Sequence, residues 1–95
     1  MQILHKKDGN KGFFHIGDEN NTLAKMTYSM AGAEKMIIDH TEVSEELRGK
    51  NAGYQMVSAA VEYARENAIR IIPLCPFANS VFKKKSELGD VLFTH

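Results

Sequence analysis

The first 43 residues divide into short segments typical of β-strands, and within residues 22–31 the chain alternates Leu23, Lys25 and Thr27 against Ala24, Met26 and Tyr28. Segments of this kind cover residues 1–6, 13–17, 22–31 and 36–43. Short polar stretches separate them and are rich in Gly, Asp and Asn, the residues of tight turns. We therefore predict an antiparallel meander of four strands, with residues 1–6 at an edge.

The hydrophobic period changes after residue 43. Between residues 52 and 67 apolar side chains recur at the spacing of one helical face, at Met56, Val57, Ala60, Val61 and Ala64. The following segment, residues 69–75, is β-branched and mostly apolar, as in a strand covered on both faces. Strand, helix and strand with short connections form a βαβ unit, so the strands at 36–43 and 69–74 should be parallel.

A shorter helix is predicted at residues 77–88 and a final strand at 90–93. The predicted class is therefore α/β or α+β. Its mixed sheet begins with an antiparallel meander, continues with a βαβ unit and is followed by a short helix. With 95 residues the chain is expected to form one domain, residues 1–95.

The amino-acid composition of the chain narrows the classes of partner and the cellular location that can be expected. Twelve basic and twelve acidic side chains cancel, so no general basic surface predicts binding to nucleic acid or to an anionic membrane. No stretch of eighteen apolar residues predicts a membrane span, and the first ten residues lack the apolar core of a signal peptide. The single cysteine, Cys75, fits a reducing compartment, and we expect a cytoplasmic protein. His5, His15 and His95 have no metal-ligand spacing with a cysteine or carboxylate, so no metal site is predicted.

The stretch ELRGKNAG, residues 46–53, lies between the strand at 36–43 and the helix at 52–67. A helix N-terminus offers unpaired N–H groups and the positive end of the macrodipole, and Arg48 and Lys50 add charge. Such a turn suits a pyrophosphate. Alternatively, Gly49 and Gly53 only satisfy the geometry of a tight connection. The spacing matches neither a P-loop nor a dinucleotide fingerprint.

The turn and two flanking segments together resemble the small, single-domain branch of the Gcn5-related N-acetyltransferases. Arg48, Asn51 and Gly53 occupy the three defined positions of that superfamily's turn motif. A His-Thr-Glu-Val stretch at 40–43 precedes the turn and a Pro-Leu-Cys-Pro stretch at 73–76 follows the helix. The resemblance covers about residues 36–85, and the upstream meander agrees with the fold of the family.

The resemblance implies binding of acetyl-CoA and transfer of its acetyl group, usually to an amine. The pyrophosphate is expected on the turn formed by Arg48, Gly49, Lys50, Asn51, Ala52 and Gly53. The pantetheine arm should lie between the strands at 36–43 and 69–74, near the backbone of Thr41 and Val43. Asn79 and Lys84 are expected to contact the CoA end.

Asn51 departs from the family motif, which has glycine at this position. Asparagine tolerates a left-handed conformation and can cap a helix, so we expect the turn to be kept. Whether the Asn51 side chain crowds the phosphate is left open by the sequence.

The predicted helix at 77–85 lacks the tyrosine that protonates the departing thiolate in the wider superfamily, and has Phe77 and Phe82 instead. In the small branch the cysteine after the fifth strand is the suspected nucleophile, and Cys75 holds that position. An acetyl-cysteine intermediate is chemically reasonable. Alternatively, Cys75 is a small buried hydrophobe.

His40 is the expected activator of Cys75, because their strands should be neighbours, and Glu42 could orient it. Strict alternation places His40 and Glu42 on the face of Met36 and Ile38, unless a bulge within 39–43 breaks the register. His40 could equally be a satisfied polar residue of the strand.

The leading hypothesis is thus an acetyl-CoA-dependent N-acetyltransferase, with Cys75 and His40 near the thioester. The alternative is a CoA or acyl-CoA binding module without turnover, and a third hypothesis is an interaction domain that has lost the ligand. The expected partners are acetyl-CoA and an amine acceptor, and the expected assembly is a monomer or a weak dimer paired through edge strands.

Overall fold

The computed structural model describes residues 2–18 and 20–94. Its centre is a five-stranded sheet in the order β1-β2-β3-β4-β5. The first four strands form the predicted antiparallel meander, and the fifth is parallel to β4. Their bounds are β1 Leu4–Asp8, β2 Lys11–Asp18, β3 Asn21–Met30, β4 Lys35–Val43 and β5 Arg70–Pro73. The predicted mixed α+β sheet is confirmed, although its edge strand begins at Leu4. Three sequence assignments involve residues outside the described part: the start of that strand at Met1, part of the turn at Glu19, and His95.

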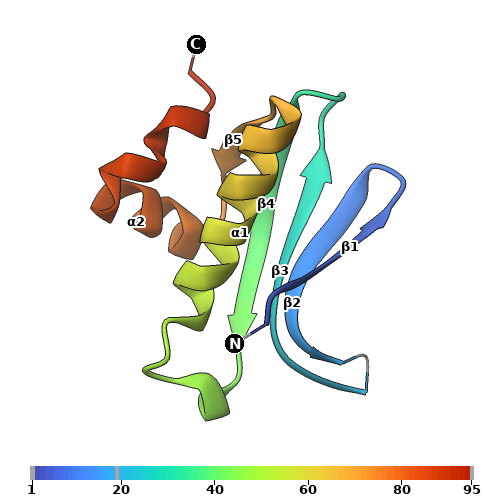
Figure 1. Cartoon of the computed structure of the whole chain (residues 1–95), viewed down its shortest axis with the longest axis vertical. Helices are drawn as coiled ribbons and strands as arrows, with labels where there is room; N and C mark the ends of the chain where they lie inside the picture. The colour runs from blue at the N-terminus through green and yellow to red at the C-terminus, as the bar shows by residue number, and fades with distance from the viewer. Residues whose placement is uncertain (1, 19, 95) are drawn as a thin grey trace.

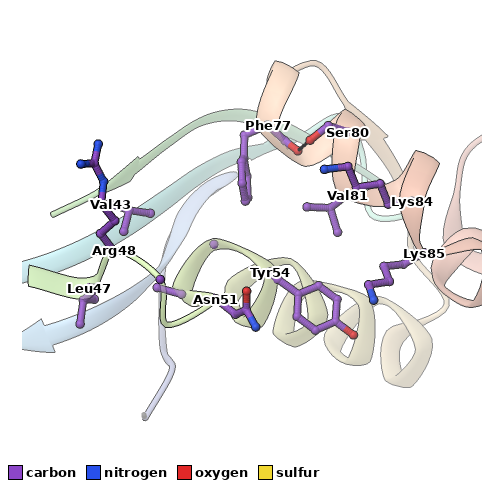
Figure 2. Close-up of a pocket in the computed structure, with 13 residues that line it drawn as sticks. Val43, Leu47, Arg48, Asn51, Tyr54, Phe77, Ser80, Val81, Lys84 and Lys85 are labelled. Atoms are coloured by element: carbon purple, nitrogen blue, oxygen red, sulfur yellow. Dashed lines mark hydrogen bonds between the residues drawn. The ribbon is translucent and has the colours of Figure 1, made fainter. Parts of the chain in front are cut away.

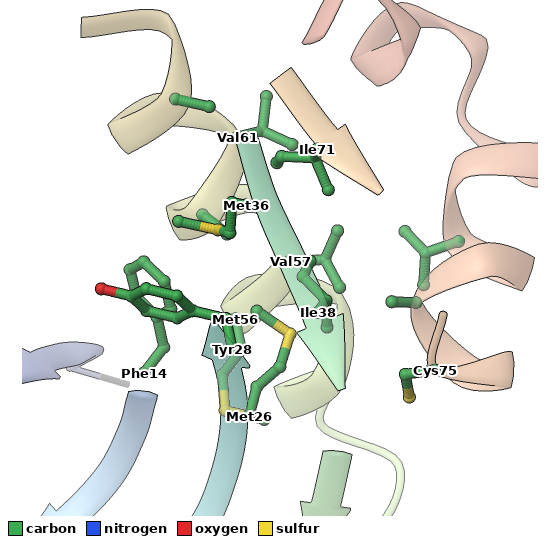
Figure 3. Packing of buried hydrophobic residues seen from close by; sticks show 14 of the residues in the cluster. Phe14, Met26, Tyr28, Met36, Ile38, Met56, Val57, Val61, Ile71 and Cys75 are labelled. Carbon is green, nitrogen blue, oxygen red and sulfur yellow. The ribbon is translucent and has the colours of Figure 1, made fainter. Parts of the chain in front are cut away.

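Two helices, α1 (Ala52–Asn67) and α2 (Pro76–Lys84), cover one face of the sheet (Figure 1). All five apolar positions predicted for the first helix are buried, which confirms the helical period read from the sequence. They pack on the largest fully buried side chains of the strands (Figure 3), namely Met26, Tyr28, Met36, Ile38 and Ile71. Among the described residues, neither α1 nor α2 has the length and apolar composition needed to cross a bilayer.

The C-terminal segment differs from the prediction. Helix α2 ends at Lys84, and a 3₁₀ helix, η2 (Ser86–Val91), includes the first half of the segment predicted as a strand. Within the described chain, the segment after η2 meets the sheet through an isolated bridge between Ile71 and Leu92. The predicted strand at 90–93 is therefore wrong.

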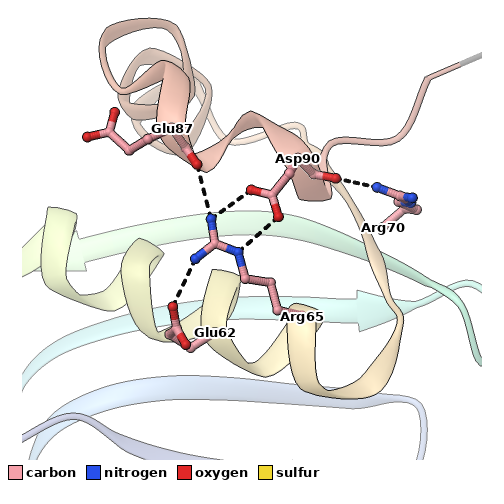
Figure 4. A network of polar contacts seen from close by, with 5 residues as sticks. All are labelled: Glu62, Arg65, Arg70, Glu87 and Asp90. Atoms are coloured by element: carbon pink, nitrogen blue, oxygen red, sulfur yellow. Dashed lines mark hydrogen bonds and ion pairs between the residues drawn. The ribbon is translucent and has the colours of Figure 1, made fainter.

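A contact between α1 and η2 explains the difference. The guanidinium of Arg65 binds both carboxylate oxygens of Asp90, at 2.9 Å from Nε and 2.7 Å from Nη2 (Figure 4). Arg65 also donates to the carbonyl of Glu87 and to the carboxylate of Glu62. The hydrogen bonds from Arg65 lower the pKa of Asp90. This network holds residues 87–90 in a tight turn against α1, where an extended strand could not reach the same partners.

Strand β4 contains a bulge at Asp39. Thr27 pairs with His40 and Tyr28 pairs with Ile38, so Asp39 has no opposite residue on β3. After the bulge, Thr41 lies opposite Met26, which is fully buried, and therefore on the helix-covered face. The bulge within 39–43 that the sequence analysis allowed for is therefore present, and it places His40 and Glu42 on the open face, away from Ile38.

An aromatic cluster attaches β1 to the core, and its histidine predicts a pH dependence. The ring of His5 stacks on Phe14 with centroids 4.1 Å apart, and its Nε2 lies 2.5 Å from the Tyr28 hydroxyl. Burial and then nearby Lys7 lower the pKa of His5, so folding favours the neutral ring. Its contribution to stability is present above about pH 6.5 and is lost as the pH falls through the lowered pKa.

We therefore expect His5→Gln to flatten the fall in the free energy of unfolding below about pH 6.5. Urea denaturation at a series of pH values measures it. A pH dependence identical to that of the wild-type chain would show that His5 is not its source.

Candidate functional site

Strands β4 and β5 separate at the centre of the sheet. Their pairing ends at Ile38 opposite Pro73, whereas β4 continues to Val43. The carbonyl of Ile38 accepts from the N–H groups of both Leu74 and Cys75, at 3.1 and 3.0 Å. Pro73 and Pro76 lie on either side of Cys75 and have no N–H group for regular strand pairing. Cys75 consequently lies where the two strands diverge.

The connection from β4 to α1 contains two left-handed residues. A short 3₁₀ helix, η1 (Glu45–Leu47), is followed by Gly49 with φ +81° and Asn51 with φ +59° and ψ +31°. A Cβ on Gly49 would meet nothing within 4 Å, so its backbone conformation, and not crowding, requires glycine. The left-handed conformation expected for Asn51 is confirmed. Its side chain makes no capping hydrogen bond, so the expected cap is wrong.

This connection is suited to an anion. The first amides of α1 have no acceptor within the helix, and the helix dipole places partial positive charge there. Left-handed residues in the turn before them make a concave arrangement of N–H groups, which is the geometry of backbone anion sites. A phosphate group is therefore the natural ligand of this turn.

A cavity of about 470 Å³ opens beside the turn, between α1 and α2 (Figure 2). This volume lies in the range of small-molecule sites. Among the described residues that line it, three are basic and none is acidic, although the whole chain has no net charge. The basic residues are Arg48, Lys84 and Lys85.

The cavity brings together most of the predicted cofactor residues. Those that line it are Val43, Arg48, Gly49, Asn51, Ala52, Gly53 and Lys84. The other three predicted cofactor residues lie outside its lining: Lys50 and Asn79 are exposed, and Thr41 is half-buried in β4. Cys75, predicted as a catalytic residue, is buried at the strand opening and also lies outside the lining.

Further lining residues were not identified from the sequence. They are Leu47, Tyr54, Phe77, Ser80, Val81 and Lys85. A signal was available for three of them, because Phe77, Ser80 and Val81 precede Lys84 by seven, four and three residues and so share its helical face. The ring of Phe77 packs against Gly53, where a Cβ would collide with it. Gly53 therefore allows close approach of α2 to the start of α1.

Cys75 is 4% exposed and precedes the first residue of α2. Its Sγ lies 3.3 Å from Oγ1 of Thr41. Burial raises the pKa of the thiol, but Thr41 and the backbone amides of Phe77 and Ala78 outweigh this effect and leave the pKa below its ordinary value. A thiol at a helix N-terminus with these neighbours has increased thiolate character.

Thr41, and not His40, is the side chain that the structure places against Cys75. The Nε2 of His40 lies 3.1 Å from Oε1 of Glu42, on the open face of the sheet, and both side chains are exposed. The sequence prediction of His40 as the neighbour of Cys75 is contradicted because the bulge at Asp39 turns His40 away. The contact shows that Glu42 lies within reach of His40, as an orienting role would require.

Comparison with known proteins gives a consistent match. A family model described as GCN5-related N-acetyl-transferase matches residues 13–91. The solution structure of a GCN5-like protein from Staphylococcus aureus has 42% sequence identity and a TM-score of 0.76, over 99% of this chain and 89% of that one. A comparison with curated protein sequences finds no match.

Two more distant structures share the fold. A ribosomal-protein-alanine N-acetyltransferase from Brucella melitensis is 14% identical, with a TM-score of 0.65 over 82% of this chain and 64% of that one. A predicted acetyltransferase from Clostridium acetobutylicum, solved with acetyl-CoA, is 17% identical, with a TM-score of 0.62 over 80% of this chain and 56% of that one. At these identities the likeness concerns the fold alone.

Proposed function

We propose, because the chain belongs to the GCN5-related N-acetyltransferase family, that its cavity binds acetyl-CoA and that the acetyl group passes through Cys75 to an amine acceptor. The observation that carries the proposal is the junction of three features. A cavity with three basic and no acidic lining residues, among those described, adjoins a left-handed turn that opens a helix. A thiol with a lowered pKa lies where β4 and β5 separate.

The residues present suit this ligand. The amides of the turn from Gly49 to Gly53, with Arg48, would hold the pyrophosphate. The backbone of β4 at Thr41 and Val43, beyond its last pair with β5, would hydrogen-bond the pantetheine arm. Lys84 would bind the nucleotide end, with Lys50 and Asn79 farther from the cavity.

Acetyl-CoA supplies an acetyl group activated as a thioester. In the proposed chemistry the Cys75 thiolate attacks the thioester carbonyl, a C–S bond to Cys75 forms, and the bond to the CoA sulfur breaks. The CoA thiolate leaves and takes up a proton from solvent. The amine then attacks the acetyl-cysteine carbonyl, which forms the amide and returns the Cys75 thiolate.

The proton released by the amine needs an acceptor. Because the bulge turns His40 away from Cys75, the proposal routes this proton through solvent to His40 on the open face of the sheet, where Glu42 lies 3.1 Å from the imidazole. Thr41 lies between His40 and Glu42 in the sequence, and it contacts Cys75 from the helix-covered face. Strand β4 thus carries the thiol's partner on one face and the proposed base on the other.

A second candidate function is a CoA-binding module without turnover, favoured by the absence of tyrosine from α2. Binding and turnover separate the two candidates. A chain that binds acetyl-CoA but releases no CoA thiol with any amine would be such a module.

Arg48→Gln tests the proposed cradle. Loss of a charge-assisted contact to phosphate should weaken acetyl-CoA binding by about tenfold, measured by isothermal titration calorimetry. Lys11→Gln is the matched control, because it removes the same charge at the start of β2, at the other end of the molecule from the turn (Figure 1). Equal affinities of the two variants would contradict the assignment of Arg48.

A further inference from the structure

The basic residues of the cavity form two separate groups. Arg48 follows η1 at the turn, whereas Lys84 and Lys85 come from the end of α2. In Figure 2 both lysines lie on the opposite side of Asn51 from Arg48, with Lys85 next to Tyr54 and Lys84 on α2 across the cavity from it. The cavity therefore presents positive charge at two separate places.

Lys85 is directed toward α1 by a specific contact. Its Nζ lies 5.4 Å from the centroid of the Tyr54 ring, in the first turn of α1, which is a cation–π distance. This contact keeps the ammonium group at the cavity although the residue is exposed. Tyr54 is thus a positioning residue for Lys85.

Helix-end electrostatics alone do not account for this arrangement. Lysines in the last turn of a helix complement its dipole, and this applies to the whole run Lys83–Lys85. Only two members of the run line the cavity, whereas Lys83 is exposed outside it. Lys83 can therefore serve as the control for Lys84 and Lys85, because it carries the same side chain at the same helix end but lies outside the cavity lining.

We propose that Lys84 and Lys85 bind the ribose 3′-phosphate of CoA, and that the protein thereby selects CoA over 3′-dephospho-CoA. The inference rests on the proposed function, in which the turn holds the pyrophosphate. CoA carries a second phosphate on its ribose, separated from the pyrophosphate by part of the nucleoside. A ligand with two anionic groups matches a cavity with two groups of cations, and the second group has no other role in the proposed acetyl transfer.

The test is calorimetric titration of the full chain with CoA and with 3′-dephospho-CoA, at low ionic strength. The wild-type chain should bind CoA at least about fivefold more tightly, the size expected for an exposed phosphate contact. Lys85→Gln and Lys84→Gln should each reduce this ratio, mainly by weakening CoA binding. Lys83→Gln, which removes the same charge from the same helix end, should leave the ratio as in the wild type.

Tyr54→Leu adds a readout for the positioning role. Because Tyr54 also lines the cavity, both affinities can fall, but CoA binding should fall more than 3′-dephospho-CoA binding, so that the CoA to dephospho-CoA ratio is reduced. A general disturbance of α1 would weaken both ligands alike and would overturn the positioning role.

Two results would overturn the selectivity while leaving the proposed function standing. One is equal, measurable affinity of the wild-type chain for both ligands. The other is a Lys83→Gln ratio reduced as much as that of Lys85→Gln, which would show a diffuse charge effect. If neither ligand binds, the proposed function itself fails, and this inference fails with it.

Discussion

Replacement of Cys75 by alanine should lower acetyl transfer by about 100-fold or more while acetyl-CoA binding stays close to that of the wild-type chain. The thiol lies at the strand opening and outside the lining of the cavity, so its removal takes away the nucleophile and leaves the phosphate contacts in place. Alanine is also small and apolar, which suits a site that is 4% exposed.

Three measurements check this expectation. Release of CoA thiol reports turnover, and calorimetry reports binding. Mass spectrometry after mixing with acetyl-CoA should find one acetyl group on the wild-type chain, located at Cys75, and none on the variant. Full turnover by Cys75→Ala would mean direct transfer from the thioester to the amine, with no cysteine intermediate.

The lowered pKa of the Cys75 thiol also predicts how the rate of acetyl transfer depends on pH. The thiolate should be available below the ordinary thiol pKa of about 8.5, so the rate should rise with pH and level off below that value. Thr41→Val keeps the shape of the side chain and removes the hydroxyl next to Sγ, so it should move the midpoint upward.

Ile38→Ala should reduce the free energy of unfolding by about 3 kcal/mol, because it deletes a fully buried side chain and leaves a cavity in the core. The loss is a large part of the stability of a small domain. Ile38 stands at the last pair between β4 and β5, under α1 (Figure 3), where few neighbours can move into the space.

Ile37→Ala is the matched control, since the same residue type is half-buried on the opposite face of β4. It should cost less than half as much. Urea denaturation of both variants gives the comparison. Equal losses would contradict the assignment of faces along β4.

The parts of the fold that follow a strong period could be predicted from the sequence. The apolar positions of α1 repeat at helical spacing from Met56 to Ala64, and short Gly- and Asn-containing turns delimit the strands of the meander. These signals are local, so no knowledge of the tertiary structure was needed to interpret them.

The errors occur where distant residues decide the local structure. The apolar run at 91–93 favours a strand, but Arg65, 25 residues before Asp90, holds the residues before this run in a tight turn. Likewise, the bulge at Asp39 depends on the register with β3, and it alone determines whether His40 or Thr41 meets Cys75.

The candidate site was predicted best where a motif fixes the backbone. Asn51 adopts the left-handed conformation expected from its position, and the turn lines the cavity. The contribution of α2 was underestimated, since the pairing of Lys85 with Tyr54 depends on the packing of two helices that the sequence does not specify. Lys50 shows the reverse: it belongs to the turn by sequence but lies outside the lining of the cavity.

The most direct test of the phosphate cradle is an amide-resolved NMR titration of the full chain with acetyl-CoA. We expect large shifts of the amides from Arg48 to Gly53 and around Cys75, with the β1–β2 hairpin at Gly9 and Asn10 unaffected. A titration to millimolar acetyl-CoA that leaves the amides of residues 48–53 unchanged would contradict the assignment of this turn as the pyrophosphate site.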